Sequence, residues 1–116
     1  MQLLKLHDKD THFHSRSNND FETAILLADE GKFIEARDIM EGLRLTYSED
    51  FRFNFYLGAI SLNLGRLRDA ESHLKKSIYQ KNDTPLSHHL LGAVFVEQGE
   101  FDKALQEFDI AINLDE

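Results

Sequence analysis

The stretches Gly31-Lys-Phe-Ile-Glu-Ala36, Gly65-Arg-Leu-Arg-Asp-Ala70 and Gly99-Glu-Phe-Asp-Lys-Ala104 share one pattern, a glycine followed five residues later by an alanine. Successive glycines are 34 residues apart, and so are the alanines. A fixed period of this length is typical of proteins built from repeated supersecondary units. The sequence therefore predicts a repeat protein whose features recur in a 34-residue register.

The apolar residues between the glycines have helical spacing. Phe55, Ala59 and Leu62 lie at i, i+4 and i+7 on one such segment. A glycine ends a helix at low cost because it adopts the left-handed conformation. Thr84-Pro85 predicts a helix start, since the missing N–H of proline costs nothing at the first helical position. We expect six helices, near residues 18–30, 33–46, 52–64, 67–80, 86–98 and 101–114.

The composition excludes several classes of protein. Hydrophobic residues make up 41% of the 116 residues, and there is no cysteine. The chain can build an ordinary core, but it can form no disulfide, thiolate metal site or thiol nucleophile. The apolar runs are too short for a signal peptide or for a membrane helix of about 20 residues. We therefore expect a cytoplasmic protein that does not insert into a membrane.

The net charge of −8 is unevenly distributed. Residues 17–50 carry three bases and nine acids, residues 51–84 six bases and three acids, and residues 85–116 one base and seven acids. An acidic chain repels phosphate backbones, so we expect no nucleic-acid partner. The alternation is interpreted as solvated helix faces, because exposed ion pairs contribute little to stability.

A helix–turn–helix unit that recurs every 34 residues resembles the tetratricopeptide repeat (TPR), whose pattern is W-x₂-L-G-x₂-Y, then A-x₃-F, then P. The third unit matches best, with Leu91-Gly92, Phe95, Ala104 and Phe108 in place and His88 at the tryptophan position. The second unit keeps Leu57-Gly58 and Ala70, whereas the first has Thr23-Ala24 for leucine-glycine; the terminal proline is absent everywhere.

The resemblance covers residues 17–116 and implies an all-α fold. We expect a right-handed α-solenoid of three helix-turn-helix (TPR-like) hairpins, residues 17–50, 51–84 and 85–116, after a flexible N-terminal arm, residues 1–16. Gly58 and Gly92 are predicted to face Ala70 and Ala104, so that the paired helices approach closely. A larger side chain at either glycine would overpack the hairpin.

In this family the first helix of each unit lines a concave surface that binds partner peptides. The resemblance therefore predicts a non-enzymatic protein–protein interaction module, adaptor or chaperone-like, that binds a largely hydrophobic peptide. The alternative for these residues is that they face the core, because a helix has one apolar stripe. The predicted groove residues are Asn18, Phe21, Ile25, Arg52, Phe55, Tyr56, Ala59, Leu62, Leu86, His89, Ala93 and Val96.

Chaperone-binding members of the family hold a C-terminal carboxylate with a clamp of Lys, Asn and Arg side chains. In this sequence no cation or amide occupies the matching places, so nothing there pairs with a carboxylate. The tail of Hsp70 or Hsp90 is therefore not an expected partner. The residues at the matching places are Phe21, Ile25, Tyr56, Leu86 and Leu90.

A second possible function comes from the last helix. Phe108, Ile112 and Leu114 lie where a following unit would cover them, and uncovered apolar surface favours association. The alternative to peptide capture is therefore a self-associating scaffold, a homodimer formed through this helix or through the N-terminal arm.

Catalytic and metal-binding patterns are weak. His7, His12 and His14 stand near acids, but ligands on a flexible arm are not preorganised. His88 and His89 are neighbours on a helix and point in different directions, so they cannot chelate together. Serine elbows, phosphate loops and zinc-protease helices are missing from the sequence. We expect no enzymatic activity, no metal and no cofactor.

Overall fold

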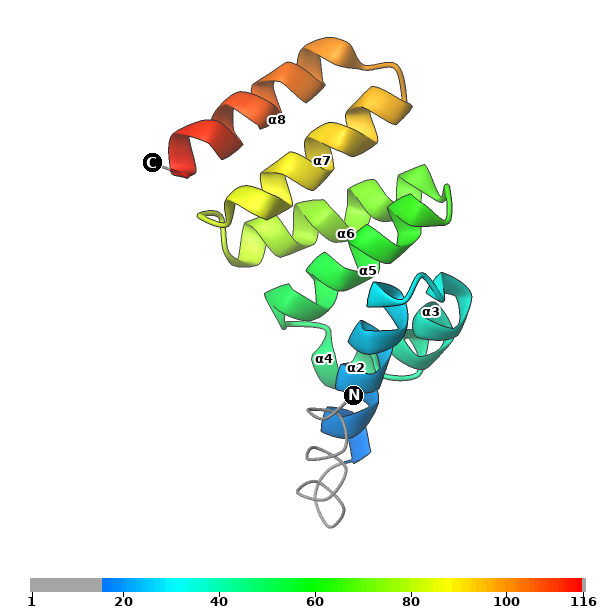
Figure 1. Ribbon diagram of the computed structural model, residues 1–116. Coiled ribbons are helices and arrows are strands. Elements are labelled where there is room, and N and C mark those ends of the chain that lie inside the picture. Colours follow the sequence, from blue (N-terminus) through cyan, green and yellow to red (C-terminus); the bar gives the residue numbers. More distant parts are fainter. Residues whose placement is uncertain (1–15, 116) are drawn as a thin grey trace. The chain divides into compact units, whose positions relative to one another are not determined.

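The computed structural model describes residues 16–115, in which every regular element is a helix (Figure 1). Almost all of the expected arm, residues 1–15, lies outside the described part. The described residues divide into two compact units, one up to residue 48 and the other from residue 49 onward. This division falls two residues before the expected boundary between the first and second hairpins. No helix between residues 16 and 115 has the length and apolar content needed to cross a membrane.

The first unit contains one hairpin, formed by α2 (Arg16–Asp29) and α3 (Phe33–Glu41), followed by the short helix α4 (Arg44–Tyr47). The prediction of one helix over 33–46 is wrong, because the helix breaks at Gly42. There the amide of Gly42 donates to the carbonyl of Ile39 at 3.1 Å, a tighter turn than that of an α-helix. Glycine is among the residues with the lowest helix propensity, so the helix breaks more easily at this position than elsewhere.

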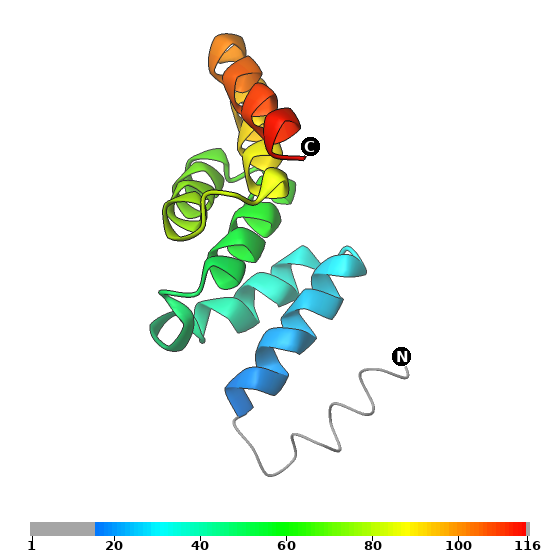
Figure 2. The same cartoon turned by 90° about the vertical axis from the view of Figure 1, so that its left-hand side faces the viewer.

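The second unit contains two hairpins, and its helices match the predicted ones to within one residue at each end. Helix α5 (Phe51–Asn63) pairs with α6 (Leu67–Gln80), and α7 (Pro85–Glu97) pairs with α8 (Phe101–Leu114). Helix α7 also packs against α6. Figure 2 gives the second view of these two pairs, in which α8 again runs beside α7. The unit is thus a stack of two hairpins.

The predicted turns at the three glycines are confirmed. Gly31, Gly65 and Gly99 have φ angles of 83°, 77° and 80°, in the left-handed region that side chains disfavour. After Gly65, the amide of Arg66 donates to the carbonyl of Ser61 at 2.8 Å, and the other two turns have the equivalent bond. This bond satisfies a carbonyl that the end of the helix would otherwise leave unpaired.

One core cluster of the second unit lies between its hairpins. Its buried residues are Ala70, Leu74, Leu91, Val94, Phe95 and Ala104.

Close approach within each hairpin depends on one glycine. A Cβ atom added to Gly58 would lie 2.5 Å from Cγ of Leu74, and one added to Gly92 would lie 2.5 Å from Cε1 of Phe108. The nearest side chains are therefore Leu74 and Phe108, which lie one turn beyond the predicted partners Ala70 and Ala104. The steric reason for glycine at these positions remains.

Candidate protein-binding site

The tryptophan position of the repeat is filled in the second unit by a buried polar residue in each hairpin. Asn54 donates through Nδ2 to Oε1 of Gln80 at 2.9 Å, which ties the start of α5 to the end of α6. His88 lies 2.8 Å from Oε1 of Glu107 through Nδ1 and 3.0 Å from the carbonyl oxygen of Asn82 through Nε2. Both oxygens only accept, so the two contacts are hydrogen bonds when each ring nitrogen carries a hydrogen. These bonds hold the beginnings of α5 and α7, the first helices of the two hairpins.

Helices α5 and α7 contact each other and carry the predicted groove residues of the second unit. Two of these residues point partly inward, since Phe55 and Leu62 pack against the buried core cluster. Others are more accessible: Leu86 is 53% exposed and Val96 is 40% exposed. Arg52 and His89 are exposed, whereas Tyr56, Ala59 and Ala93 are half-buried. We call the accessible residues Tyr56, Ala59, Leu86, His89, Ala93 and Val96 the inner row.

The first unit carries the three remaining groove residues on α2. Phe21 is only 5% exposed, and its ring centroid lies 4.9 Å from that of Tyr47. The fold thus places Phe21 in the core of this unit rather than at a surface open to a partner. Ile25 is half-buried, and Asn18 lies in the first turns of α2. The apolar stripe of α2 is used for packing, as the alternative interpretation of the sequence anticipated for some residues.

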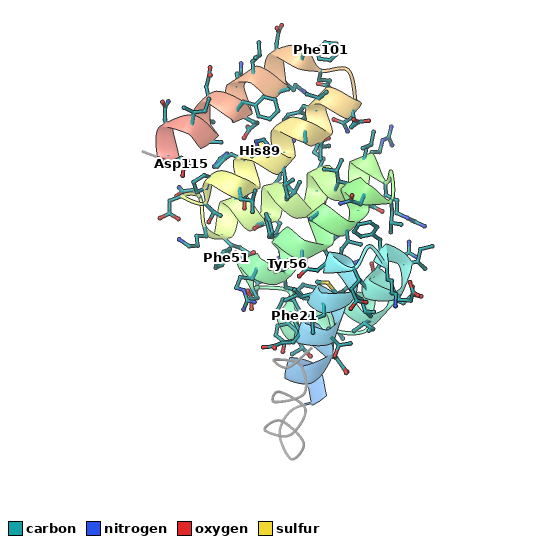
Figure 3. The ribbon with its side chains drawn as sticks, viewed as in Figure 1. Phe21, Phe51, Tyr56, His89, Phe101 and Asp115 are labelled. Carbon is teal, nitrogen blue, oxygen red and sulfur yellow. The ribbon has the colours of Figure 1, made fainter. Side chains whose placement is uncertain are left out.

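A second surface lies at one side of the α7–α8 hairpin, where an open pocket has a volume of about 600 Å³. His89 of α7 and Phe108 of α8 meet there, with ring centroids 5.4 Å apart. Figure 3 shows His89 and Asp115 at the same end of this hairpin, with Phe101 at the opposite end. We call this surface the end face; its residues are Pro85, Leu86, His89, Phe108, Ala111, Ile112 and Asp115.

The exposed apolar surface extends along α8 beyond the predicted residues. Ile112 is 62% exposed and Leu114 is 38% exposed, while Phe108 is half-buried. Phe101 and Leu105, at 62% and 61% exposed, were missed by the sequence analysis. Their spacing with Phe108 and Ile112, i, i+4, i+7 and i+11, is the signal that finds them.

The interface between α6 and α7 is edged with charge. Lys75 donates to Glu71, and this bond is the main reason why the pKa of Glu71 lies below its ordinary value, although partial burial opposes the shift. The amide Nε2 of Gln98, at the end of α7, donates to Oε1 of Glu71 at 3.1 Å. A hydrogen bond from Lys103 to Glu100 raises the pKa of Lys103 in the same way. Glu71 and Glu100 are therefore both engaged in ion pairs with lysine.

Metal binding finds no support between residues 16 and 115. No group of three or more His, Asp or Glu side chains there is arranged to hold an ion. The side chain of His89 is exposed, whereas that of His88 is buried. The histidines of the expected arm, His7, His12 and His14, lie outside the described residues.

Comparison with known proteins identifies the fold. No family model and no curated protein matches the sequence. The fold is similar to MamA MSR-1, with a TM-score of 0.79 and 20% identity over 98% of this chain and 64% of that one. It is also similar to MamA from Desulfovibrio magneticus RS-1, with a TM-score of 0.84 and 16% identity over 98% of this chain and 65% of that one. This chain therefore spans just under two thirds of the length of either protein.

A third similar structure is the type III secretion translocator chaperone SycD of Yersinia enterocolitica, in complex with a peptide of the translocator YopD. The TM-score is 0.78, with 20% identity over 84% of this chain and 74% of that one. At these identities the likeness shows the fold and nothing more. The chain folds as an all-α, TPR-like helical solenoid.

Proposed function

We propose that this protein is a non-enzymatic protein–protein interaction module, adaptor or chaperone-like, which binds a largely hydrophobic peptide segment along its inner helices. The observation that carries the proposal is the inner row of α5 and α7, which includes Leu86 and Val96, 53% and 40% exposed. Apolar side chains left accessible on adjacent helices provide anchor sites for the side chains of a bound peptide.

Two further observations support a protein ligand. A protein of similar fold, SycD, is described in complex with a peptide of a translocator. The five places that match the carboxylate clamp of chaperone-binding TPR proteins also hold no lysine or arginine, which argues against an Hsp70 or Hsp90 tail. A peptide held mainly by apolar contacts matches this surface.

The test uses the whole chain and a phage-displayed library of random 15-residue peptides. Peptides that are selected and then synthesised should be rich in apolar residues, and calorimetry measures their affinity. Val96→Glu places a charge in the inner row and should weaken binding at least tenfold. Tyr79→Glu, at a side chain of α6 that is 91% exposed, adds the same charge elsewhere and should leave affinity unchanged.

Two outcomes would contradict the proposal. If no peptide is selected, or if Val96→Glu binds as tightly as the unaltered chain, the inner row is not the binding site. Circular dichroism of both variants checks that the helices are intact.

Self-association is the second proposal, and it is favoured by the exposure of Ile112 and Leu114 on α8. Light scattering after gel filtration tests it over a range of protein concentrations. A monomer at every concentration would rule it out.

A further inference from the structure

The end face has an equivalent surface on the α5–α6 hairpin of the same unit, and that surface is covered by a helix. A shift of 34 residues converts the end face into Phe51, Arg52, Phe55, Leu74, Ser77, Ile78 and Lys81 of the α5–α6 hairpin. Helix α7 covers that hairpin: Leu74 and Ser77 are 0% exposed, and Phe55 and Ile78 pack against the buried core cluster. In the α7–α8 hairpin the equivalent residue of Ile78 is Ile112, which is 62% exposed.

The helix that covers the α5–α6 hairpin defines the shape of the occupant. Leu91, Val94 and Phe95 of α7 are buried in the cluster that includes Leu74. Their spacing, i, i+3 and i+4, is the apolar stripe of an amphipathic helix. Because the end face is the equivalent, in the 34-residue register, of the surface that α7 covers, we expect a helix with the same stripe to fit it.

The charges differ between the two hairpins, and most of the changes make the α8 segment more acidic; the exception is Lys103, which stands in the place of Asp69. The four acidic residues of the α8 segment stand where the α6 segment has a base or a histidine: Asp102 for Arg68, Glu107 for His73, Asp109 for Lys75 and Asp115 for Lys81. One of these positions borders the covering helix, and another borders the open pocket. Nζ of Lys75 lies 5.9 Å from the ring centroid of Phe95 in α7, and Asp115 lines the pocket of the end face.

We propose that the end face binds an amphipathic helix of a partner protein, with apolar residues at i, i+3 and i+4 and lysine or arginine along its edges. The reversed charge is what selects a basic helix, since it attracts cations to a rim that carries Asp109 and Asp115. This occupant competes with the self-association proposed above; two α8 helices would bring their acids together, which makes a second copy of this chain the poorer ligand for the end face. The end face shares Leu86 and His89 with the inner row, but Ile112 and Asp115 belong to the end face alone, so the inference does not depend on peptide binding at the inner row.

The test uses two synthetic peptides of residues 85–98, the segment that covers the α5–α6 hairpin. The basic peptide carries His89→Lys, Ala93→Lys and Val96→Lys, and the acidic peptide carries glutamate at the same three positions. Both keep Leu91, Val94 and Phe95. Fluorescence anisotropy measures their affinity for the whole chain, and the basic peptide should bind at least tenfold more tightly at low salt, with a difference that shrinks as salt is added.

Two variants of the whole chain locate the binding. Ile112→Asp removes apolar contact while keeping the rim acidic, and it should weaken the basic peptide at least tenfold. The double variant Asp109→Lys with Asp115→Lys introduces the lysines that the α5–α6 hairpin has at the equivalent positions. It should reverse the preference, so that the acidic peptide binds more tightly. Val96→Glu in the inner row should leave the basic peptide bound.

Three results would overturn the inference. The first is equal binding of the two peptides, and the second is binding that Ile112→Asp leaves unchanged, because charge alone would then hold the peptide. The third is that the unaltered chain binds neither peptide and forms a dimer which Ile112→Asp abolishes. The end face would then be a contact between copies of the chain. Loss of peptide selection at the inner row, by contrast, would affect only the proposed function.

Discussion

Helices α6 and α8 occupy the same place in consecutive hairpins, and each has 14 residues, yet their surroundings differ. Helix α7 covers one side of α6, where Leu74 is 0% exposed. The same side of α8 is open, with Ile112 62% exposed beside a pocket of about 600 Å³. In a repeat protein, stability is the sum of terms within a unit and between neighbours. Equivalent residues, such as the half-buried Ile78 and the exposed Ile112, therefore differ in exposure according to what packs against them.

The largest effect expected from this difference is on the stability lost when an apolar side chain of α6 or α8 is shortened to alanine. Leu74→Ala should lower the free energy of unfolding by about 2–5 kcal/mol, because it leaves a cavity in a sealed site. Ile112→Ala, on the open side of α8, should change it by less than about 0.5 kcal/mol. Urea unfolding followed by circular dichroism measures both. Similar losses in the two variants would mean that the α8 side is covered in solution.

A smaller difference is expected at the two glycines where the helices approach closely. In Gly58→Ala the new Cβ meets Cγ of the sealed Leu74 and comes within 3.3 Å of its backbone nitrogen, so overpacking should cost about 1–3 kcal/mol. In Gly92→Ala it meets only ring atoms of Phe108, which borders the open pocket. The ring can move aside, and the higher helix propensity of alanine, up to about 1 kcal/mol, offsets the cost.

Thermal melting of the two alanine variants separates these cases. We expect a clear fall in Tm for Gly58→Ala and little change for Gly92→Ala. A larger fall for Gly92→Ala would show that the Phe108 ring is held as firmly as Leu74.

The smallest effect concerns the charged edge of the α6–α7 interface. Glu71, whose pKa is lowered chiefly by the hydrogen bond from Lys75, contributes stability above its ordinary value of 4.5. That contribution is lost as the pH falls through the lower value of the folded state. Glu71→Gln should therefore cost less than about 1 kcal/mol at pH 7, and this cost should disappear in acid.

Leu105 provides the matched control, since it takes the place of Glu71 in α8. Leu105→Gln should change the free energy of unfolding by less than about 0.5 kcal/mol at either pH. Denaturation in urea at pH 7 and pH 3 compares the two variants. A cost for Glu71→Gln that persists at pH 3 would mean that the bonds to Lys75 and Gln98 do not stabilise the folded state through charge.

Much of the fold could be predicted from the sequence, because its main signals are local. The left-handed turns at Gly31, Gly65 and Gly99 depend on conformations that glycine alone adopts readily. The helices of the second unit follow from the spacing of apolar residues around these turns. The break at Gly42 was missed because a single glycine inside an apolar pattern does not by itself end a helix.

The candidate site was predicted less completely, because exposure depends on neighbours. Phe21 and Phe55 hold equivalent places in the repeat, and both aromatic rings suited a groove. Phe21 instead packs on Tyr47 in its own unit, and Phe55 packs against a core cluster that includes residues of α7. Which side of each helix is apolar can be read from the sequence, but what covers that side cannot.

By itself the sequence determined the 34-residue period, the positions of the turns and the change of charge from one hairpin to the next. Only the tertiary structure decided which apolar residues are sealed and which remain accessible, including the open side of α8 and its pocket. The physical reason is that turn conformation and helical spacing are properties of a few consecutive residues. Burial is a property of two surfaces in contact, and those surfaces come from segments far apart in the chain.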